Sequence, residues 1–61
     1  MSYTAKEKRE AAERELKMRQ RVYPRWVADK RMTQEKADHE TAVMAAIVED
    51  YKTQERVERL I

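Results

Sequence analysis

The stretch Val22-Tyr23-Pro24-Arg25-Trp26-Val27 divides this 61-residue chain into two helical patterns, and it contains the only proline and the only tryptophan. A proline inside a helix removes one backbone hydrogen bond and clashes with the preceding turn, so the helix is expected to kink there. Alternatively, the helix breaks at Tyr23 and Pro24 opens a new turn as its first helical residue. Because the apolar pattern continues in register through Trp26 and Val27, we favour a kinked first helix that continues to about residue 30.

The first helix is expected to begin near residue 5, because Thr4 and Glu7 have the spacing of a capping box. Its apolar face repeats at a helical period and consists of Ala12, Leu16, Tyr23, Trp26 and Val27. Arg19 falls inside this face. Its side chain either extends along the core with the guanidinium at the edge or pairs with a carboxylate of the other helix.

The second helix is expected from residue 34 to about 52 or beyond, with Thr33 as its N-cap. The turn at about residues 30–33 lacks the glycine that often ends a helix. The apolar face of this helix consists of Ala37, Thr41, Met44, Ile47, Val48 and Tyr51. Further on, the same face carries Glu55 and Glu58, so we expect the buried stripe to end near Tyr51 and a frayed tail to reach residue 61.

These patterns predict an all-α fold, an antiparallel helical hairpin with a Pro-kinked first helix, as a single domain over residues 1–61. Two helices cannot enclose a core, and a chain of this size buries only about 60% of its unfolded surface. The chain has no cysteine that could supply a disulfide. We therefore expect a homodimeric four-helix bundle. Its core and dimer residues are expected to be Leu16, Met44, Ile47, Val48 and Tyr51.

The composition favours long helices and a cytoplasmic location. Charged residues make up 43% of the chain and glycine is absent. Because both signs are interspersed among strong helix formers, long helices are a better interpretation than disorder. The sequence has no apolar run of about 18 residues that could span a membrane. Its N-terminus is polar and lacks the apolar segment of a signal peptide.

The charges are distributed unevenly along the chain. Residues 17–31 contain six basic residues and one acid, whereas residues 34–50 contain five acids and one base. The two segments therefore attract each other across the hairpin or across a dimer, or the basic segment binds an external anionic partner. We favour the first interpretation.

A cluster of basic and aromatic residues is the best candidate for a partner-binding site. It consists of Arg19, Tyr23, Arg25 and Trp26. Such a cluster can form the centre of a protein interface or can stack bases and bind phosphates. In the simplest interpretation, which we favour, the aromatic pair closes the apolar end of the hairpin, and the arginines pair with Asp38 and Glu40.

No pattern indicates catalysis. His39 lies between two acids, Asp38 and Glu40, but it is the only histidine and it lies off the apolar stripe. A metal site needs more ligands than this, so we expect an exposed histidine, no metal and no cofactor. The sequence has no glycine-rich phosphate loop and no nucleophile–base pair. We therefore expect that the protein is not an enzyme. A DNA-reading helix-turn-helix is disfavoured because the second helix is acidic.

Four segments carry a resemblance to a known family. They are Arg14-Glu15-Leu16-Lys17-Met18-Arg19, Val22-Tyr23-Pro24-Arg25-Trp26-Val27, Arg31-Met32-Thr33-Gln34 and Ala42-Val43-Met44-Ala45-Ala46-Ile47-Val48-Glu49-Asp50-Tyr51. Together they resemble small early-region proteins of lambdoid phages and prophages, which are encoded between the excision and recombination genes. The resemblance implies an accessory protein in the bacterial host cytoplasm that acts on host physiology or on the lysis–lysogeny decision. From the cluster we expect binding of a host or phage protein, and as the alternative a nucleic-acid-associated regulator that uses residues 17–31.

Overall fold

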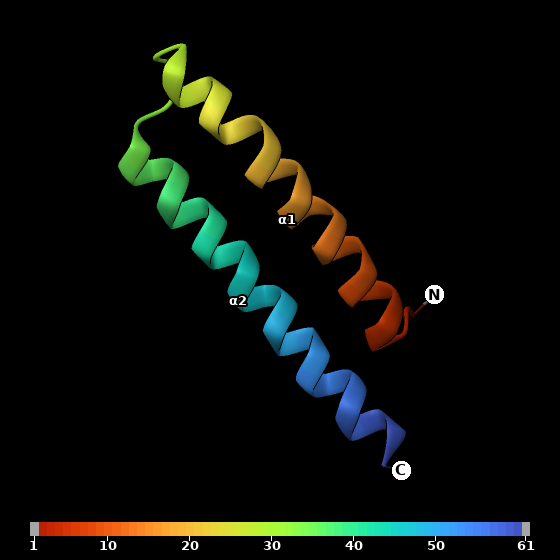
Figure 1. Ribbon diagram of the computed structural model, residues 1–61. Helices are drawn as coiled ribbons and strands as arrows, with labels where there is room; N and C mark the ends of the chain where they lie inside the picture. Colours follow the sequence, from red (N-terminus) through yellow and green to blue (C-terminus); the bar gives the residue numbers. More distant parts are fainter. Residues whose placement is uncertain (1, 61) are drawn as a thin grey trace.

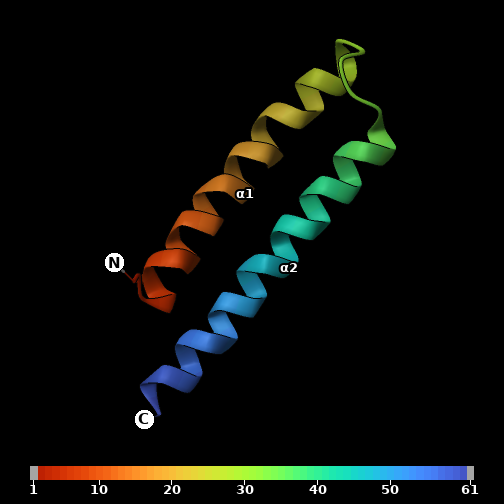
Figure 2. The same ribbon diagram turned by 180° about the vertical axis from the view of Figure 1, so that it is seen from behind.

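The protein is an all-α antiparallel helical hairpin (Figure 1). The computed structural model describes residues 2–60. Helix α1 spans Ala5–Ala28 and helix α2 spans Gln34–Arg59. The helices lie side by side when seen from either side (Figure 2), and the molecule measures 47 × 19 × 17 Å. The start of α1 and the end of α2 lie at one end, the open end of the hairpin, and α2 projects there beyond the start of α1 (Figure 1).

The first helix begins as the sequence predicts. The Thr4 hydroxyl accepts from the Glu7 backbone N–H at 3.0 Å, and the Thr4 backbone N–H donates to the Glu7 carboxylate at 3.2 Å. These reciprocal bonds form a capping box, which satisfies two backbone donors that a helix end otherwise leaves free.

Helix α1 continues through Pro24 without interruption and ends at Ala28, about two residues before the expected end. The alternative in which the chain breaks at Tyr23 is therefore not observed. Pro24 has no N–H, so the carbonyl of Gln20 loses its usual helical donor. Both residues are exposed, so water can reach this carbonyl. The kink at Pro24 stays a prediction.

The chain reverses direction through a Schellman motif that is built without glycine. The Lys30 N–H donates to the Val27 carbonyl at 3.0 Å, and the Arg31 N–H donates to the Trp26 carbonyl at 2.9 Å. This pair of bonds requires a left-handed residue after the helix end, a position that glycine usually occupies. Here Lys30 adopts it with φ 62°. Thr33 then caps α2 by accepting from the Lys36 N–H at 3.1 Å.

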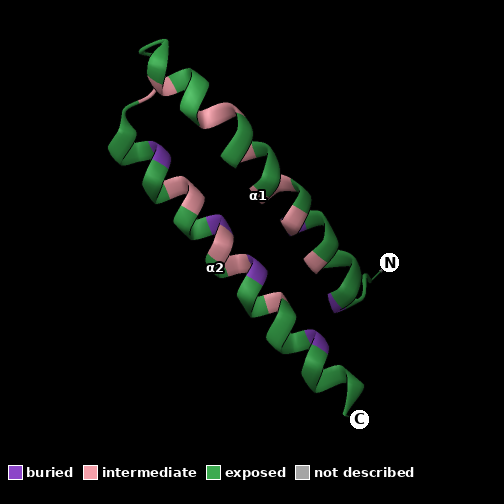
Figure 3. Cartoon of the chain, viewed as in Figure 1, coloured by how far each residue is buried: buried purple, intermediate pink, exposed green. Residues whose placement is uncertain are grey.

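The core is a narrow seam between the two helices (Figure 3). Ala12, Met44 and Val48 form its buried cluster, and the larger side chains of Leu16, Ile47 and Tyr51 are half-buried against it. Ala5 and Ala37 are buried nearer the two ends. The five residues expected in the core thus line the seam, but only Met44 and Val48 of them are buried.

The buried side of α2 extends beyond Tyr51, which corrects the expected end of the stripe. Glu55 is only 8% exposed, because Arg9 of α1 covers its carboxylate and donates a hydrogen bond to it. The segment expected to be a frayed tail is helical to Arg59. The last position of that expected tail, residue 61, lies outside the described residues, as does residue 1.

Replacement of Lys30 by glycine is expected to stabilise the hairpin. A left-handed conformation costs a non-glycine residue about 1–2 kcal/mol, whereas the added freedom of glycine in the unfolded chain costs about 0.4–1 kcal/mol. We expect Lys30→Gly to raise the free energy of unfolding by about 0.5–1 kcal/mol, measured by urea denaturation. Lys36→Gly, within α2, is the matched control and should lower it by about 1 kcal/mol. A decrease in both variants would contradict the assigned role of Lys30.

Candidate functional site

The basic and aromatic residues expected to form a site come together at the closed end of the hairpin, near the turn. The rings of Tyr23 and Trp26 lie 5.5 Å apart between centroids at an interplanar angle of 36°. The guanidinium carbon of Arg19 lies 6.0 Å from the centre of the Tyr23 ring. This geometry is within the range of aromatic pairing and of cation–π attraction.

Arg19 is a structural residue of this cluster. Its guanidinium donates to the main-chain carbonyl of Glu40 at 2.8 Å and to the Glu15 carboxylate at 3.0 Å, and it lies 3.7 Å from the Glu40 carboxylate. Its side chain is 21% exposed. The sequence left two possibilities for the Arg19 side chain, extension to the edge of the core or pairing with a carboxylate of the other helix. The structure shows the pairing, with a carboxylate from each helix. Arg19 is therefore not free to bind a partner.

Trp26 and Arg25 are the accessible members of the cluster. Trp26 is 36% exposed, and Arg25 is exposed and forms no ion pair within residues 2–60. The expected pairing of the arginines with acids of α2 therefore holds only for Arg19. Asp38 instead accepts from the Gln34 side chain at 2.8 Å. The surface that can contact a partner is thus reduced to Trp26, Arg25 and one side of the half-buried Tyr23.

Sequence reasoning did not identify an apolar strip that continues from Trp26 along the hairpin. We define it as Met18, Val22 and Trp26 of α1 with Val43 and Ile47 of α2. Spacings of four residues place each set on one side of its helix. Both sets lie beside the ion pairs that Arg19 forms with Glu15 and Glu40. Glu15 lies three residues before Met18 on α1, and Glu40 lies three residues before Val43 on α2. The strip remains accessible: Val43 is 41% exposed, and Met18, like Trp26, is 36% exposed. Helical wheels of the two helices, viewed together, could have revealed it.

The outer edges of the hairpin carry opposite charges. The basic edge of α1 consists of the exposed residues Arg14, Lys17, Arg21 and Arg25. The acidic edge of α2 consists of the exposed residues Glu35, Asp38, Glu49 and Asp50. Between the described residues, the only ion pairs that link the two helices are Arg9–Glu55 and Arg19–Glu40. The residues of the basic edge and of the acidic edge therefore form no ion pairs with each other within the described part of the hairpin.

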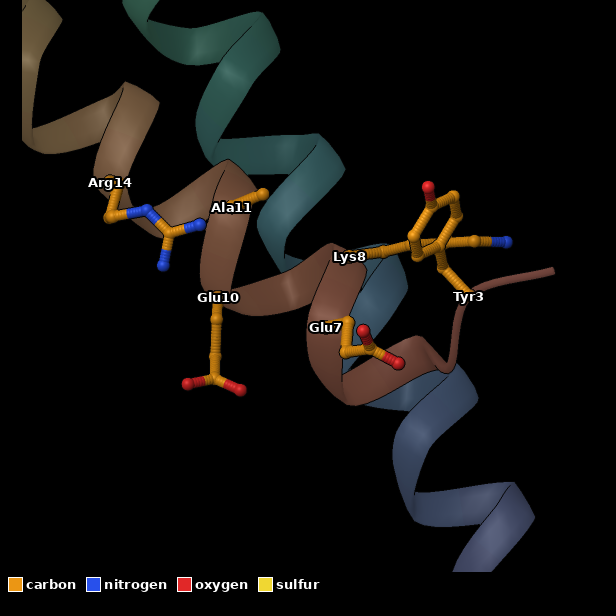
Figure 4. A pocket seen from close by; sticks show the side chains of 6 residues that line it. All are labelled: Tyr3, Glu7, Lys8, Glu10, Ala11 and Arg14. Carbon is orange, nitrogen blue, oxygen red and sulfur yellow. The ribbon is translucent and has the colours of Figure 1, made fainter. Parts of the chain in front are cut away.

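Hollows on this surface do not gather reactive groups. One hollow lies at the open end, and its lining includes Tyr3, Lys8, Ala11 and Arg14 (Figure 4). All six residues that line it, Glu10 included, are exposed. His39 is exposed. Across residues 2–60, no three histidine, cysteine or carboxylate side chains lie close enough together to hold a metal ion.

The most strongly interacting charges lie at the open end, away from the aromatic cluster. Glu55 accepts from Arg9 of α1 and, at 3.1 Å, from Arg59 of its own helix. Arg9 also donates to Glu13 at 3.0 Å. The hydrogen bond from Arg9 holds the pKa of Glu55 below its ordinary value of about 4.5, although burial acts in the opposite direction. The same bond raises the pKa of Arg9, so the pair remains ionised at neutral pH.

Because the pKa of Glu55 is lower in the folded state, its ionisation stabilises the hairpin above a pH of about 4.5. This contribution is lost as the pH falls from there through the folded-state pKa. We expect Glu55→Gln to reduce the loss of thermal stability in acid, measured by circular dichroism between about pH 3 and 7. The control Glu58→Gln changes an exposed glutamate of the same helix and should retain the wild-type pH profile. Identical profiles for Glu55→Gln and the wild type would contradict this role.

Comparisons with known proteins identify no relative: no family matches this sequence, and no curated protein or solved structure is significantly similar to it. Between residues 2 and 60, neither helix is long and apolar enough to cross a membrane.

Proposed function

We propose that this protein acts by binding another protein through the closed end of the hairpin. The observation that carries the proposal is the exposure of Trp26, the only tryptophan, beside the unpaired Arg25. Tryptophan, tyrosine and arginine are enriched among residues that dominate binding energy at protein interfaces. The cation–π and aromatic contacts of Tyr23 hold this surface in place, so binding loses little side-chain freedom.

The mechanism would be occlusion or bridging. A rigid hairpin of 47 Å with its aromatic residues near one end can cover a site on its partner, and it can also link two partners. Neither action needs a reacting group. This agrees with the arrangement of the described residues, where the exposed charges are dispersed along the two edges.

The biological setting is also a proposal, and it is supported only by the sequence resemblance described above. We propose that the protein is an early accessory protein of a lambdoid phage or prophage, located in the cytoplasm of the bacterial host. Its partner would then be a host or phage protein, and the effect of binding would be on host physiology or on the choice between lysis and lysogeny.

The alternative function is association with nucleic acid. It is favoured by the basic edge, whose four cations recur every three or four residues of α1 and have no ion-pair partner among residues 2–60. Phosphate contacts from such a row would give affinity that falls steeply with salt. The acidic edge of α2 opposes this interpretation, because it repels a second contact with the same polyanion.

Affinity capture from host lysate distinguishes the two functions. We expect the wild type to capture a protein that is retained after nuclease treatment. Trp26→Ala and Arg25→Ala should each weaken its binding by about 30-fold or more, measured by titration with the purified partner. Tyr3→Ala and Arg56→Ala are matched controls, since they remove an exposed aromatic and an exposed basic residue elsewhere.

Circular dichroism should show unchanged helicity in all four variants. Equal binding by wild type and Trp26→Ala would contradict the proposed site. Nuclease-sensitive capture, together with salt-dependent retardation of DNA or RNA, would instead establish the alternative function.

A further inference from the structure

We propose that the middle of the apolar strip, formed by Met18, Val22, Val43 and Ile47, is covered by a second copy of this chain, and that α1 of each copy packs against α2 of the other. The two-fold axis of this dimer runs parallel to the helices, so both turns lie at the same end. The proposal concerns the middle of the hairpin and does not depend on binding of another protein at the closed end.

The exposed area of a single chain supports a missing partner. The chain exposes 5069 Å², whereas a compact monomer of 7.4 kDa exposes about 4,200 Å². The excess, roughly 900 Å², is similar to the area of about 800 Å² that each partner contributes to an interface of standard size. The area that a second copy needs is thus available on one hairpin.

The charged group at the centre of the apolar strip already has hydrogen-bond partners within the hairpin. This group, the guanidinium of Arg19, bonds to the Glu40 carbonyl and to the Glu15 carboxylate. No buried side-chain nitrogen or oxygen among residues 2–60 lacks a hydrogen-bond partner. Burial of an ion pair is tolerated when its hydrogen bonds are satisfied in this way. A second copy would therefore meet apolar side chains around an arginine that is already paired within its own hairpin.

The charges of the basic and acidic edges favour one of two possible arrangements of the dimer. When two hairpins pack face to face, a two-fold axis perpendicular to the helices places α1 over α1 and α2 over α2. That arrangement brings like charges together along both edges. An axis parallel to the helices places α1 over α2 of the other copy, so each basic edge meets an acidic edge. Attraction along both seams favours this second arrangement.

The register of the hairpin gives the arrangement specific charge pairs. Arg9 pairs with Glu55 and Arg19 pairs with Glu40 across the seam, so Arg14, midway between the two arginines, lies within one helical turn of the level of Asp50. An axis parallel to the helices preserves this level, so Arg14 then lies near Asp50 of the other copy. The same symmetry brings two Trp26 side chains to one end of the dimer, which would give the proposed binding surface two equivalent halves.

Charge reversal tests both the dimer and its arrangement. The basic-edge variant carries Arg14→Glu, and the acidic-edge variant carries Asp50→Lys. We expect the wild type to be a dimer by analytical ultracentrifugation, and each variant alone to associate at least about tenfold more weakly. An equal mixture should form a heterodimer, identified by native mass spectrometry, because both seams then join opposite charges. A chain with both substitutions should recover the homodimer.

Recovery in the mixture shows that neither variant failed merely by misfolding. Val43→Glu, which places a charge in the apolar strip, should dissociate the dimer and should not be rescued by mixing with either variant. A wild type that remains monomeric at the highest attainable concentration would overturn the proposal. Dimers that are indifferent to both charge reversals, or variants that do not recover on mixing, would overturn the arrangement of α1 against α2.

Discussion

The structure depends on a single seam along which two helices bury small and medium-sized side chains. Ala12 on α1 allows Met44 and Val48 of α2 to approach closely, and these three residues form the buried cluster. No third element covers the opposite side of either helix within residues 2–60. Because so little apolar area is buried, interactions that usually supplement a core become essential here: helix caps, the Schellman turn and ion pairs across the seam.

Two arginines of α1 reach across this seam, and they do so with different geometry. Arg9 meets a carboxylate at the open end, whereas Arg19 donates to the main-chain carbonyl of Glu40 across the seam and to the Glu15 carboxylate of its own helix. A main-chain acceptor has a fixed position along the helix, so Arg19 helps to define how far α2 is shifted along α1. The apolar residues of the seam are less selective, since packing of this kind tolerates several registers.

Much of the fold could be predicted from the sequence, because the signals that define it are local. The capping box at Thr4, the N-cap at Thr33 and the helical periods depend on residues three or four positions apart. The pairing of Arg9 with Glu55 could not be predicted in this way. Glu55 seemed to end the apolar face, and only the register of the folded hairpin places a cation opposite it. Lys30 was equally hard to anticipate, because a left-handed lysine contradicts the usual preference for glycine.

The candidate site was predicted only in part, for a similar reason. The composition of the cluster was evident, but the sequence could not decide which arginine pairs internally. Arg19 is paired across the seam, whereas Arg25 points outward, and they differ by less than two helical turns. The apolar strip was missed because it combines two short rows, one from each helix, and neither row is conspicuous alone.

The tight turn at one end and the ionic contact at the other have a consequence for how the chain folds. The Schellman bonds join residues that are three and five positions apart, whereas Arg9 and Glu55 are separated by 46 positions. Closing the longer loop costs more chain entropy, so contacts should form progressively from the turn toward the termini. The hairpin then behaves as a molecular zipper. Its terminal turns open most often, and the segment around the turn is the last to lose its structure.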